Sequence, residues 1–223
     1  MDVKGLFMLI DQGESQVLDF KYCISDSRKI AKTLAAFANT DGGKLLIGVR
    51  DNGSIAGVQS EEEFYMIDAA ASLFCKPAVK YNIIQHHSEG KTVLEVKIEK
   101  SDNRPVYAKD DTGKWIAYLR KDDQNLAVNR VILKVWKNEY RKNGLLIKVR
   151  KAESLLFEYL HQNNSISLSK FRRISRLPLH KAENILSDLI TCGILDFDLS
   201  EKGCSYHASE KLDEQLPDSY LSY

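Results

Sequence analysis

The sequence predicts an α+β protein of two domains, a larger one that mixes strands with helices and a smaller one that is mainly helical. Over about the first 143 residues, segments that alternate apolar and polar residues are interleaved with segments of helical periodicity. From residue 150 to residue 209, short helical segments are followed by two strand-like segments. We therefore expect domains at residues 1–143 and 150–209, with a polar tail at residues 210–223.

The first predicted strand covers residues 16–23 and places Leu18, Phe20 and Tyr22 on the face that should meet the core. A helix begins after Ser25 or Asp26, which can cap it, and ends before the glycine pair at 42–43. The remaining elements are expected in this order: a buried strand at 45–49, a turn at 51–53, a helix from 60 to 77, strands at 80–87 and 92–100, a hairpin at 104–120 and a helix at 127–141.

The second domain should contain three helices and a hairpin. The periodicity predicts helices over residues 152–160, 168–174 and 178–192, with a turn at 175–177 between the last two. Two candidate wing strands follow at residues 194–199 and 204–208. Helices followed by a hairpin in this order are typical of a winged helix-turn-helix domain.

Bulk composition narrows the classes of function. With 32 Lys and Arg against 31 Asp and Glu, the net charge of +1 provides no general attraction to polyanions, so nucleic-acid binding would need a local basic patch. The four cysteines are scattered, and the apolar stretch at the N-terminus is too short for a signal peptide or a membrane span. We expect a cytoplasmic protein with no membrane contact and reduced thiols.

Two stretches resemble the signature of the Schlafen AlbA-like domain. They read ESQVLDFK at residues 14–21 and AFANTDGGKLLIGVRDNGSIAG at residues 36–57. RPVY at 104–107 and YLR at 118–120 are similar to that family's closing hairpin, so the resemblance covers roughly the first 130 residues. It implies an α+β fold and nucleic-acid binding, and bacterial members often join this domain to a winged helix. An ATPase is not supported, because the chain has no GxxxxGK[ST] phosphate loop.

The resemblance also implies a candidate metal site. In nuclease members three carboxylates hold a divalent ion for RNA cleavage, and they correspond here to Glu14, Asp19 and Asp51. Mg²⁺ or Mn²⁺ suits such an all-oxygen cluster. The second acid is Asp where the family has Glu, which draws that carboxylate back by one methylene. The alternative is that Glu14 is a solvated or capping acid, Asp19 pairs with a nearby base and Asp51 forms a turn.

Other residues of this segment also have two interpretations. Lys21 points to the same face of the strand as Asp19, where it would either bind a phosphate or form an ion pair with that acid. Asn39, Gly42 and Gly43 would either present backbone amides to a phosphate or shape the turn from helix to strand, and the turn is the commoner role.

A second candidate surface lies in the winged-helix segment. Between Ser165 and Cys192 there are five Lys or Arg residues and two acids, Glu183 and Asp188. Contacts to phosphates and base edges are expected from the third helix and the segment before it. The candidate nucleic-acid-binding residues here are Lys170, Arg172, Arg173, Arg176, His180, Lys181, Asn184 and Ser187.

The sequence thus predicts a protein that binds DNA or RNA, of the DNA-binding transcriptional-regulator type, with the first domain as a second binding surface and a homodimer interface. Two alternatives stay open. One is a metal-dependent endoribonuclease that uses Glu14, Asp19 and Asp51. The other is a protein-interaction module in which neither surface touches nucleic acid.

Overall fold

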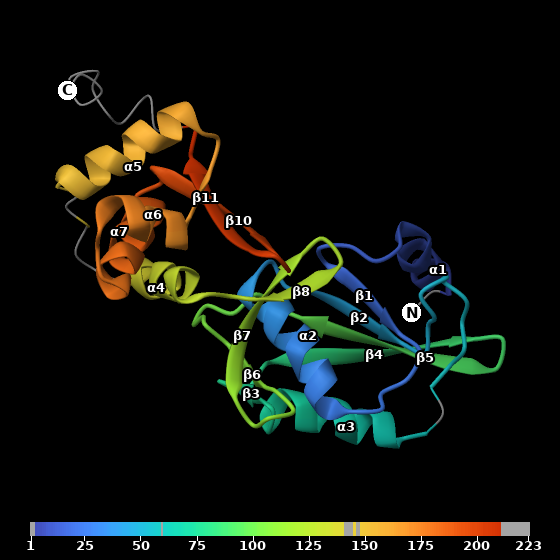
Figure 1. The fold of residues 1–223 in the computed structure, drawn as a ribbon. Coiled ribbons are helices and arrows are strands. Elements are labelled where there is room, and N and C mark those ends of the chain that lie inside the picture. The colour runs from blue at the N-terminus through green and yellow to red at the C-terminus, as the bar shows by residue number, and fades with distance from the viewer. Residues whose placement is uncertain (1–2, 59, 141–144, 146–147, 211–223) are drawn as a thin grey trace. The chain divides into compact units, whose positions relative to one another are not determined.

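The computed structural model of the chain describes residues 3–58, 60–140, 145 and 148–210 (Figure 1). The chain divides into two compact units, Met1–Ala127 and Val128–Tyr223. The division therefore falls earlier than the predicted limit at residue 143. The reason is that helix α4 (Arg130–Glu139) packs on a helix of the second unit, although its sequence directly follows the hairpin of the first. The predicted boundary at residues 143–144 and the tail from residue 211 lie outside the described residues.

The first unit contains a four-stranded sheet with the order β1-β2-β5-β4. β1 pairs parallel with β2, whereas β5 is antiparallel to both β2 and β4. Because Asp19 of β1 lies opposite Leu45 of β2, its side chain is on the same face as Leu45, and Phe20 shares the other face with Leu46. The strands of this sheet are β1 (Leu18–Lys21), β2 (Gly43–Ile47), β4 (Tyr81–Ser88) and β5 (Lys91–Ile98).

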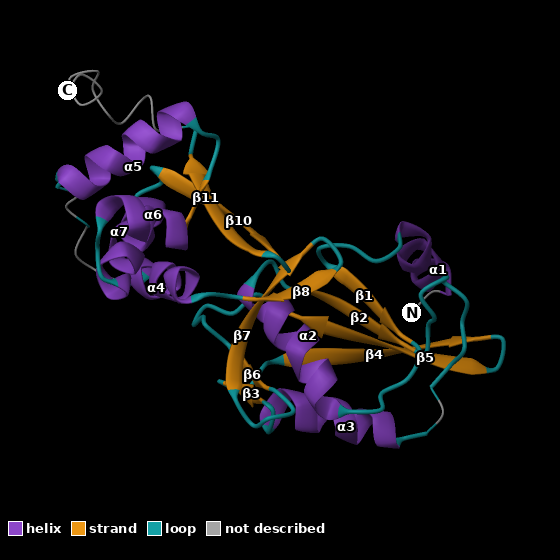
Figure 2. Ribbon diagram, viewed as in Figure 1, coloured by secondary structure: helices purple, strands orange, loops and turns teal. Residues whose placement is uncertain are grey.

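Helix α2 (Ser27–Asn39) is the centre of the first unit, as Figure 2 shows. The Asp26 side chain caps it, as expected, by accepting a hydrogen bond from the Arg28 amide. Nine of its residues are buried, because α2 packs on the first sheet, on a second sheet and on helix α3 (Glu62–Ser72). The second sheet has the order β3-β6-β7-β8 and comprises β3 (Cys75–Lys76), β6 (Tyr107–Lys109), β7 (Trp115–Lys121) and β8 (Gln124–Ala127).

A helix that the sequence analysis missed, α1 (Val3–Gln12), covers the other face of the first sheet. Its Leu6 is fully buried in a small core with Leu18, Phe20 and Leu46. This burial confirms that Leu18 and Phe20 face a core, whereas Tyr22 is exposed. Leu6, Leu9 and Ile10 of this N-terminal stretch have the spacing of one face of a helix, a signal that is independent of any targeting segment.

Glu95 is also buried on the face of the first sheet that carries Leu46, although strand alternation placed it in solvent. Its carboxylate lies 2.9 Å from Lys44 Nζ and 2.7 Å from His86 Nε2. The two partners compensate the buried charge.

The second unit has its own core, built from helices and a small sheet with the order β10-β11-β9. Tyr206 of β11 is fully buried in it, and its hydroxyl accepts a hydrogen bond from Asn129, the residue that caps α4. None of the described helices is both long and apolar enough to cross a bilayer. Besides α4, the unit comprises α5 (Lys151–Gln162), β9 (Ile166–Ser167), α6 (Leu168–Ser175), α7 (Leu179–Thr191), β10 (Leu195–Ser200) and β11 (Gly203–Ala208).

Candidate nucleic-acid interface

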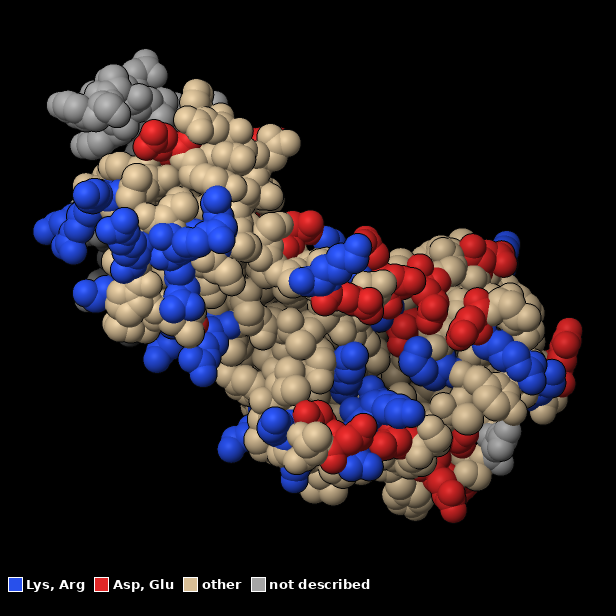
Figure 3. Space-filling view, viewed as in Figure 1, with Lys and Arg blue, Asp and Glu red and all other residues tan. Residues whose placement is uncertain are grey.

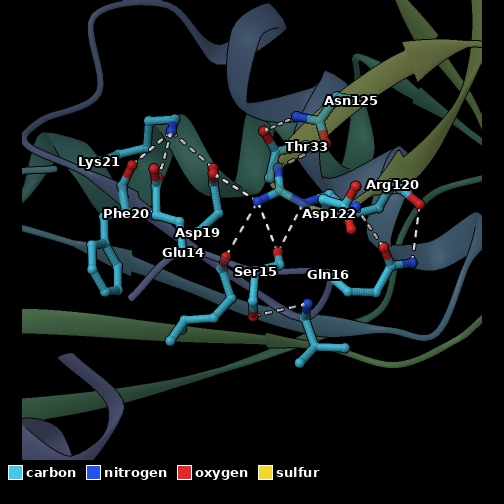
Figure 4. Close-up of polar contacts among 12 residues, drawn as sticks. Glu14, Ser15, Gln16, Asp19, Phe20, Lys21, Thr33, Arg120, Asp122 and Asn125 are labelled. Atoms are coloured by element: carbon cyan, nitrogen blue, oxygen red, sulfur yellow. Dashed lines mark hydrogen bonds and ion pairs between the residues drawn. The ribbon is translucent and has the colours of Figure 1, made fainter. Parts of the chain in front are cut away.

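Two of the three acids predicted to hold a metal lie together, with a lysine between them (Figure 4). The Lys21 ammonium is 2.8 Å from Asp19 Oδ2 and 3.9 Å from Glu14 Oε1, and it donates a 2.6 Å hydrogen bond to the Phe20 carbonyl. Glu14 Oε1 also accepts the Phe20 amide at 2.9 Å. Of the two interpretations of Lys21, the ion pair with Asp19 is the one that the structure shows.

The other partner of Asp19 is Arg120, which the sequence analysis did not single out as a functional residue. Its side chain is 1% exposed, and Nη2 donates to Asp19 Oδ1 at 3.1 Å. The same guanidinium donates to the carbonyls of Ser15 and Leu18 and to Asn125 Oδ1. Arg120 therefore joins β7 to the start of β1 (Figure 4). The only indication of Arg120 in the sequence is its position in the YLR motif at residues 118–120, which is similar to the family's closing hairpin.

Asp51 does not join this group. It is exposed in the turn after β2, where Gly53 donates its amide to the Arg50 carbonyl. Among the residues that the structure describes, no three His, Cys, Asp or Glu side chains are grouped so that they could hold a metal ion. The three-carboxylate site is thus not formed, and the turn role is the one that Asp51 has.

The electrostatics of the two remaining acids also disfavour a divalent cation. Both Asp19 oxygens lie beside a cation, and the Lys21 ammonium takes the place between the carboxylates that a metal would need. Burial raises the pKa of Glu14, and the adjacent Asp19 adds to the rise, which outweighs the lowering by the Phe20 amide and by Lys21.

Gly42 and Gly43 shape the turn, because a Cβ at either position would clash, whereas Asn39 links the end of α2 to residues 106 and 118. The buried Asn39 amide group donates to the Val106 and Tyr118 carbonyls and accepts the Val106 amide. Gly42 has φ +74°, and a Cβ there would lie 2.7 Å from the Ile98 carbonyl oxygen. Because the Gly42 amide is already bonded to the Phe37 carbonyl, it is not free to bind a phosphate.

The predicted basic patch of the second unit is on the surface. Arg172, Arg173, Arg176 and Lys181 are exposed, and Lys170 is half-buried against the Tyr159 ring. Figure 3 shows Lys and Arg side chains gathered on the face of this unit that is in view. None of these five cations forms an ion pair with another described residue. We call Lys170, Arg172, Arg173, Arg176 and Lys181 the basic face.

The two acids of the same segment are turned away from solvent toward α4. Glu183 is 4% exposed and its Oε2 lies 2.8 Å from Lys134 Nζ. Asp188 is half-buried and accepts a hydrogen bond from the Asn138 amide at 3.1 Å. The basic face therefore keeps its positive charge, although the sequence places two acids among the five cations.

Two of the candidate residues on α7 already make contacts within the unit. Ser187 is 1% exposed, and its hydroxyl donates to the Asn184 carbonyl, which corrects its assignment as a surface residue. Asn184 is exposed, but its Oδ1 accepts a hydrogen bond from Lys134 Nζ at 2.8 Å. His180 and Lys181, in the first turn of α7, are exposed as predicted.

A groove of about 860 Å³ runs between the start of α5, the end of α6 and the start of α7. Arg176 and Lys181 of the basic face line it together with Arg150 and Lys151. Arg176 projects there because it ends α6 in the left-handed conformation, with φ +55°. The positive charge thus extends from α6 and the turn onto the first residues of α5.

The sequence matches one family, described as Schlafen, AlbA_2 (SLFN_AlbA_2), over residues 14–129. No curated protein matches it. Among solved structures, it is similar to the DIP2311 protein from Corynebacterium diphtheriae, at 17% identity and a TM-score of 0.44 over 86% of this chain. This chain spans only 34% of the length of that one. It is also similar to the N-terminal domain of a RecG-related protein from Nitrosomonas europaea, at 26% identity and a TM-score of 0.38, over 56% of this chain and 95% of that one.

Proposed function

The chain belongs to the Schlafen, AlbA_2 family, and from this membership and the basic face we propose that it is a nucleic-acid-binding protein whose second unit contacts the phosphates of a duplex. The observation that carries the proposal is the separation of charge around α7. Four exposed cations and the half-buried Lys170 have no ion-pair partner among the described residues, while both acids of the segment are held by α4. Exposed Arg and Lys side chains on one face are what phosphate binding requires.

The arrangement of the second unit supports the assignment of a winged helix-turn-helix. α5, α6 and α7 supply the three helices, β10 and β11 form the hairpin, and Arg176 to Pro178 form the turn that precedes α7. In such domains the helix after the turn approaches the duplex. The role of transcriptional regulator is our finer proposal, and it rests on this element order.

The proposal can be tested through the salt dependence of binding. The affinity of the whole protein for a fluorescently labelled 20-bp duplex, measured by anisotropy between about 50 and 300 mM salt, should fall steeply because bound phosphates release counterions. Arg172→Gln, Arg173→Gln and Arg176→Gln combined should reduce the slope of log K against log salt by about 2.7, since each lost phosphate contact contributes about 0.9.

A matched control removes three exposed lysines from the first unit, as Lys29→Gln, Lys76→Gln and Lys80→Gln combined. Its net charge changes by the same amount, so the slope should stay close to that of the unchanged protein if the basic face is the contact surface. Equal slopes for the two triple variants would refute the proposal. Absence of binding at low salt would favour a protein-interaction module instead.

No observation favours the endoribonuclease alternative. The acids that would hold the metal are paired with Lys21 and Arg120, and Asp51 lies apart from them in an exposed turn.

A further inference from the structure

Helix α4 covers one side of α7, the helix that would approach the duplex. Four apolar residues of α4 are buried, namely Val131, Ile132, Val135 and Trp136. Val131 belongs to the core of the second unit, and the capping residue Asn129 is bonded to the buried Tyr206. α4 is thus a structural part of this unit, since removing it would open the core.

Polar contacts join α4 to α7 along most of the length of α7. Lys134 Nζ lies 2.8 Å from both Glu183 Oε2 and Asn184 Oδ1. One turn further along α4, Asn138 Nδ2 donates to Asp188 Oδ1 at 3.1 Å and to Thr191 Oγ1 at 3.4 Å. Together with the buried Ser187, these contacts engage the face of α7 from residue 183 to residue 191.

Base reading needs side chains that are free to present donors and acceptors to base edges. An asparagine reads adenine through its carbonyl oxygen and its amide nitrogen together. Asn184 does not meet that requirement, because its oxygen already accepts from Lys134, and Ser187 is buried. Apart from Asn184, the exposed polar side chains of α7 are His180 and Lys181 in its first turn, and a long cationic side chain such as that of Lys181 is suited to phosphates.

From this arrangement we infer that the second unit binds duplex DNA by contacting the phosphate backbone of the DNA and discriminates little between base sequences. α4 stays in place on α7 when the DNA binds. The inference rests on the proposed function and specifies its partner as duplex DNA in general. A regulator built on this unit would take its sequence preference from a part of the protein other than α7.

Competition binding tests this inference on the whole protein. A labelled duplex is displaced with unlabelled duplexes of equal length that are A/T-rich, G/C-rich or of mixed sequence, at one salt concentration. We expect affinities within about threefold of one another. A preference above about tenfold would overturn the inference and leave the proposed function standing, because a single base-pair change in a site read by side chains typically changes the affinity by about 5- to 150-fold. Failure to bind any duplex would overturn both.

Two single variants distinguish base reading by Asn184 from phosphate contact by Lys181. Asn184→Ala should change the affinity for every duplex by less than about twofold, because Asn184 is held by Lys134. Lys181→Ala should weaken binding to all of them by a similar factor, as expected for a lost phosphate contact. If Asn184→Ala weakened binding to one sequence and spared the others, Asn184 would be a base-reading residue and the inference would be wrong.

The position of α4 during binding can be followed through Trp136, which is 3% exposed. In a Trp115→Phe background it is the only tryptophan, because the chain has two. Its emission should keep the same wavelength when saturating duplex is added, since α4 stays on α7. A red shift toward the emission of solvent-exposed tryptophan would mean that α4 leaves and that α7 becomes free to read bases.

Discussion

Replacing Arg120 by Met should destabilise the first unit by about 3 kcal/mol. Removing one partner of a buried ion pair typically costs about 3–5 kcal/mol, because the other charge stays buried without compensation. The Asp19 and Arg120 side chains are 4% and 1% exposed. We expect the lower end of the range because Lys21, 2.8 Å from Asp19 Oδ2, still compensates part of the charge. The carbonyls of Ser15 and Leu18 also lose the guanidinium as a donor, although each still accepts a backbone amide.

Urea denaturation followed by circular dichroism measures this loss, with the transition of the first unit fitted separately from that of the second. Arg28→Met is the matched control, since the Arg28 side chain is 41% exposed and pairs with the partly exposed Asp26 and the exposed Asp111, so its loss should change the midpoint little. The double variant Asp19→Leu with Arg120→Met should lose less than the sum of the two single changes. Equal midpoints for Arg120→Met and the unchanged protein would refute the structural role of the pair.

Further predictions concern other buried groups of the first unit. Burial by itself raises the pKa of Glu95, but hydrogen bonds from its two partners outweigh that effect and lower the pKa. The ionised Glu95 therefore stabilises the folded state at pH values above its unfolded pKa, and this contribution is lost as the pH falls through its folded pKa. In urea titrations between pH 7 and pH 3, the stability of Glu95→Gln should accordingly fall less than that of the unchanged protein. Gly42→Ala should lower the urea midpoint more than Gly90→Ala, because both glycines have positive φ but only Gly42 has a backbone oxygen within 3 Å of the added carbon, and equal losses would contradict this. Burial raises the pKa of the Cys75 thiol to about 12, so at pH 8 Cys75 should be alkylated far more slowly than the half-buried Cys23 until urea unfolds the unit. Mass spectrometry measures both rates, and equal rates in the folded protein would show that Cys75 is accessible.

Most elements of the first unit were predictable because their signals are local. The cap at Asp26, the apolar spacing of α2, the glycine turn before β2 and the alternation of Leu94, Val96 and Ile98 each depend on neighbours in the chain. The helices and hairpin of the second unit were predictable for the same reason. α1 was missed because its apolar residues were weighed only as a possible targeting segment.

The partners of charged residues were not predictable, because they come from distant parts of the chain. Arg120 lies 101 positions from Asp19 and Lys134 lies 49 positions from Glu183. Strand alternation and helical periodicity show only which residues share a face, and neither shows that an opposite charge lies on another element. The same limit applies to the position of the domain boundary. The sequence of α4 indicates that one side of the helix is apolar, but not which unit that side packs against.

The sequence alone identifies the family, the α+β class, the order of most elements and the concentration of five cations between residues 165 and 192. Folding then sets which charged groups find partners. It paired Asp19 with Lys21 and Arg120, left Asp51 apart, and turned Glu183 and Asp188 toward α4. The physical reason is that a buried charge requires a partner, and only the folded chain brings together residues that lie far apart in sequence.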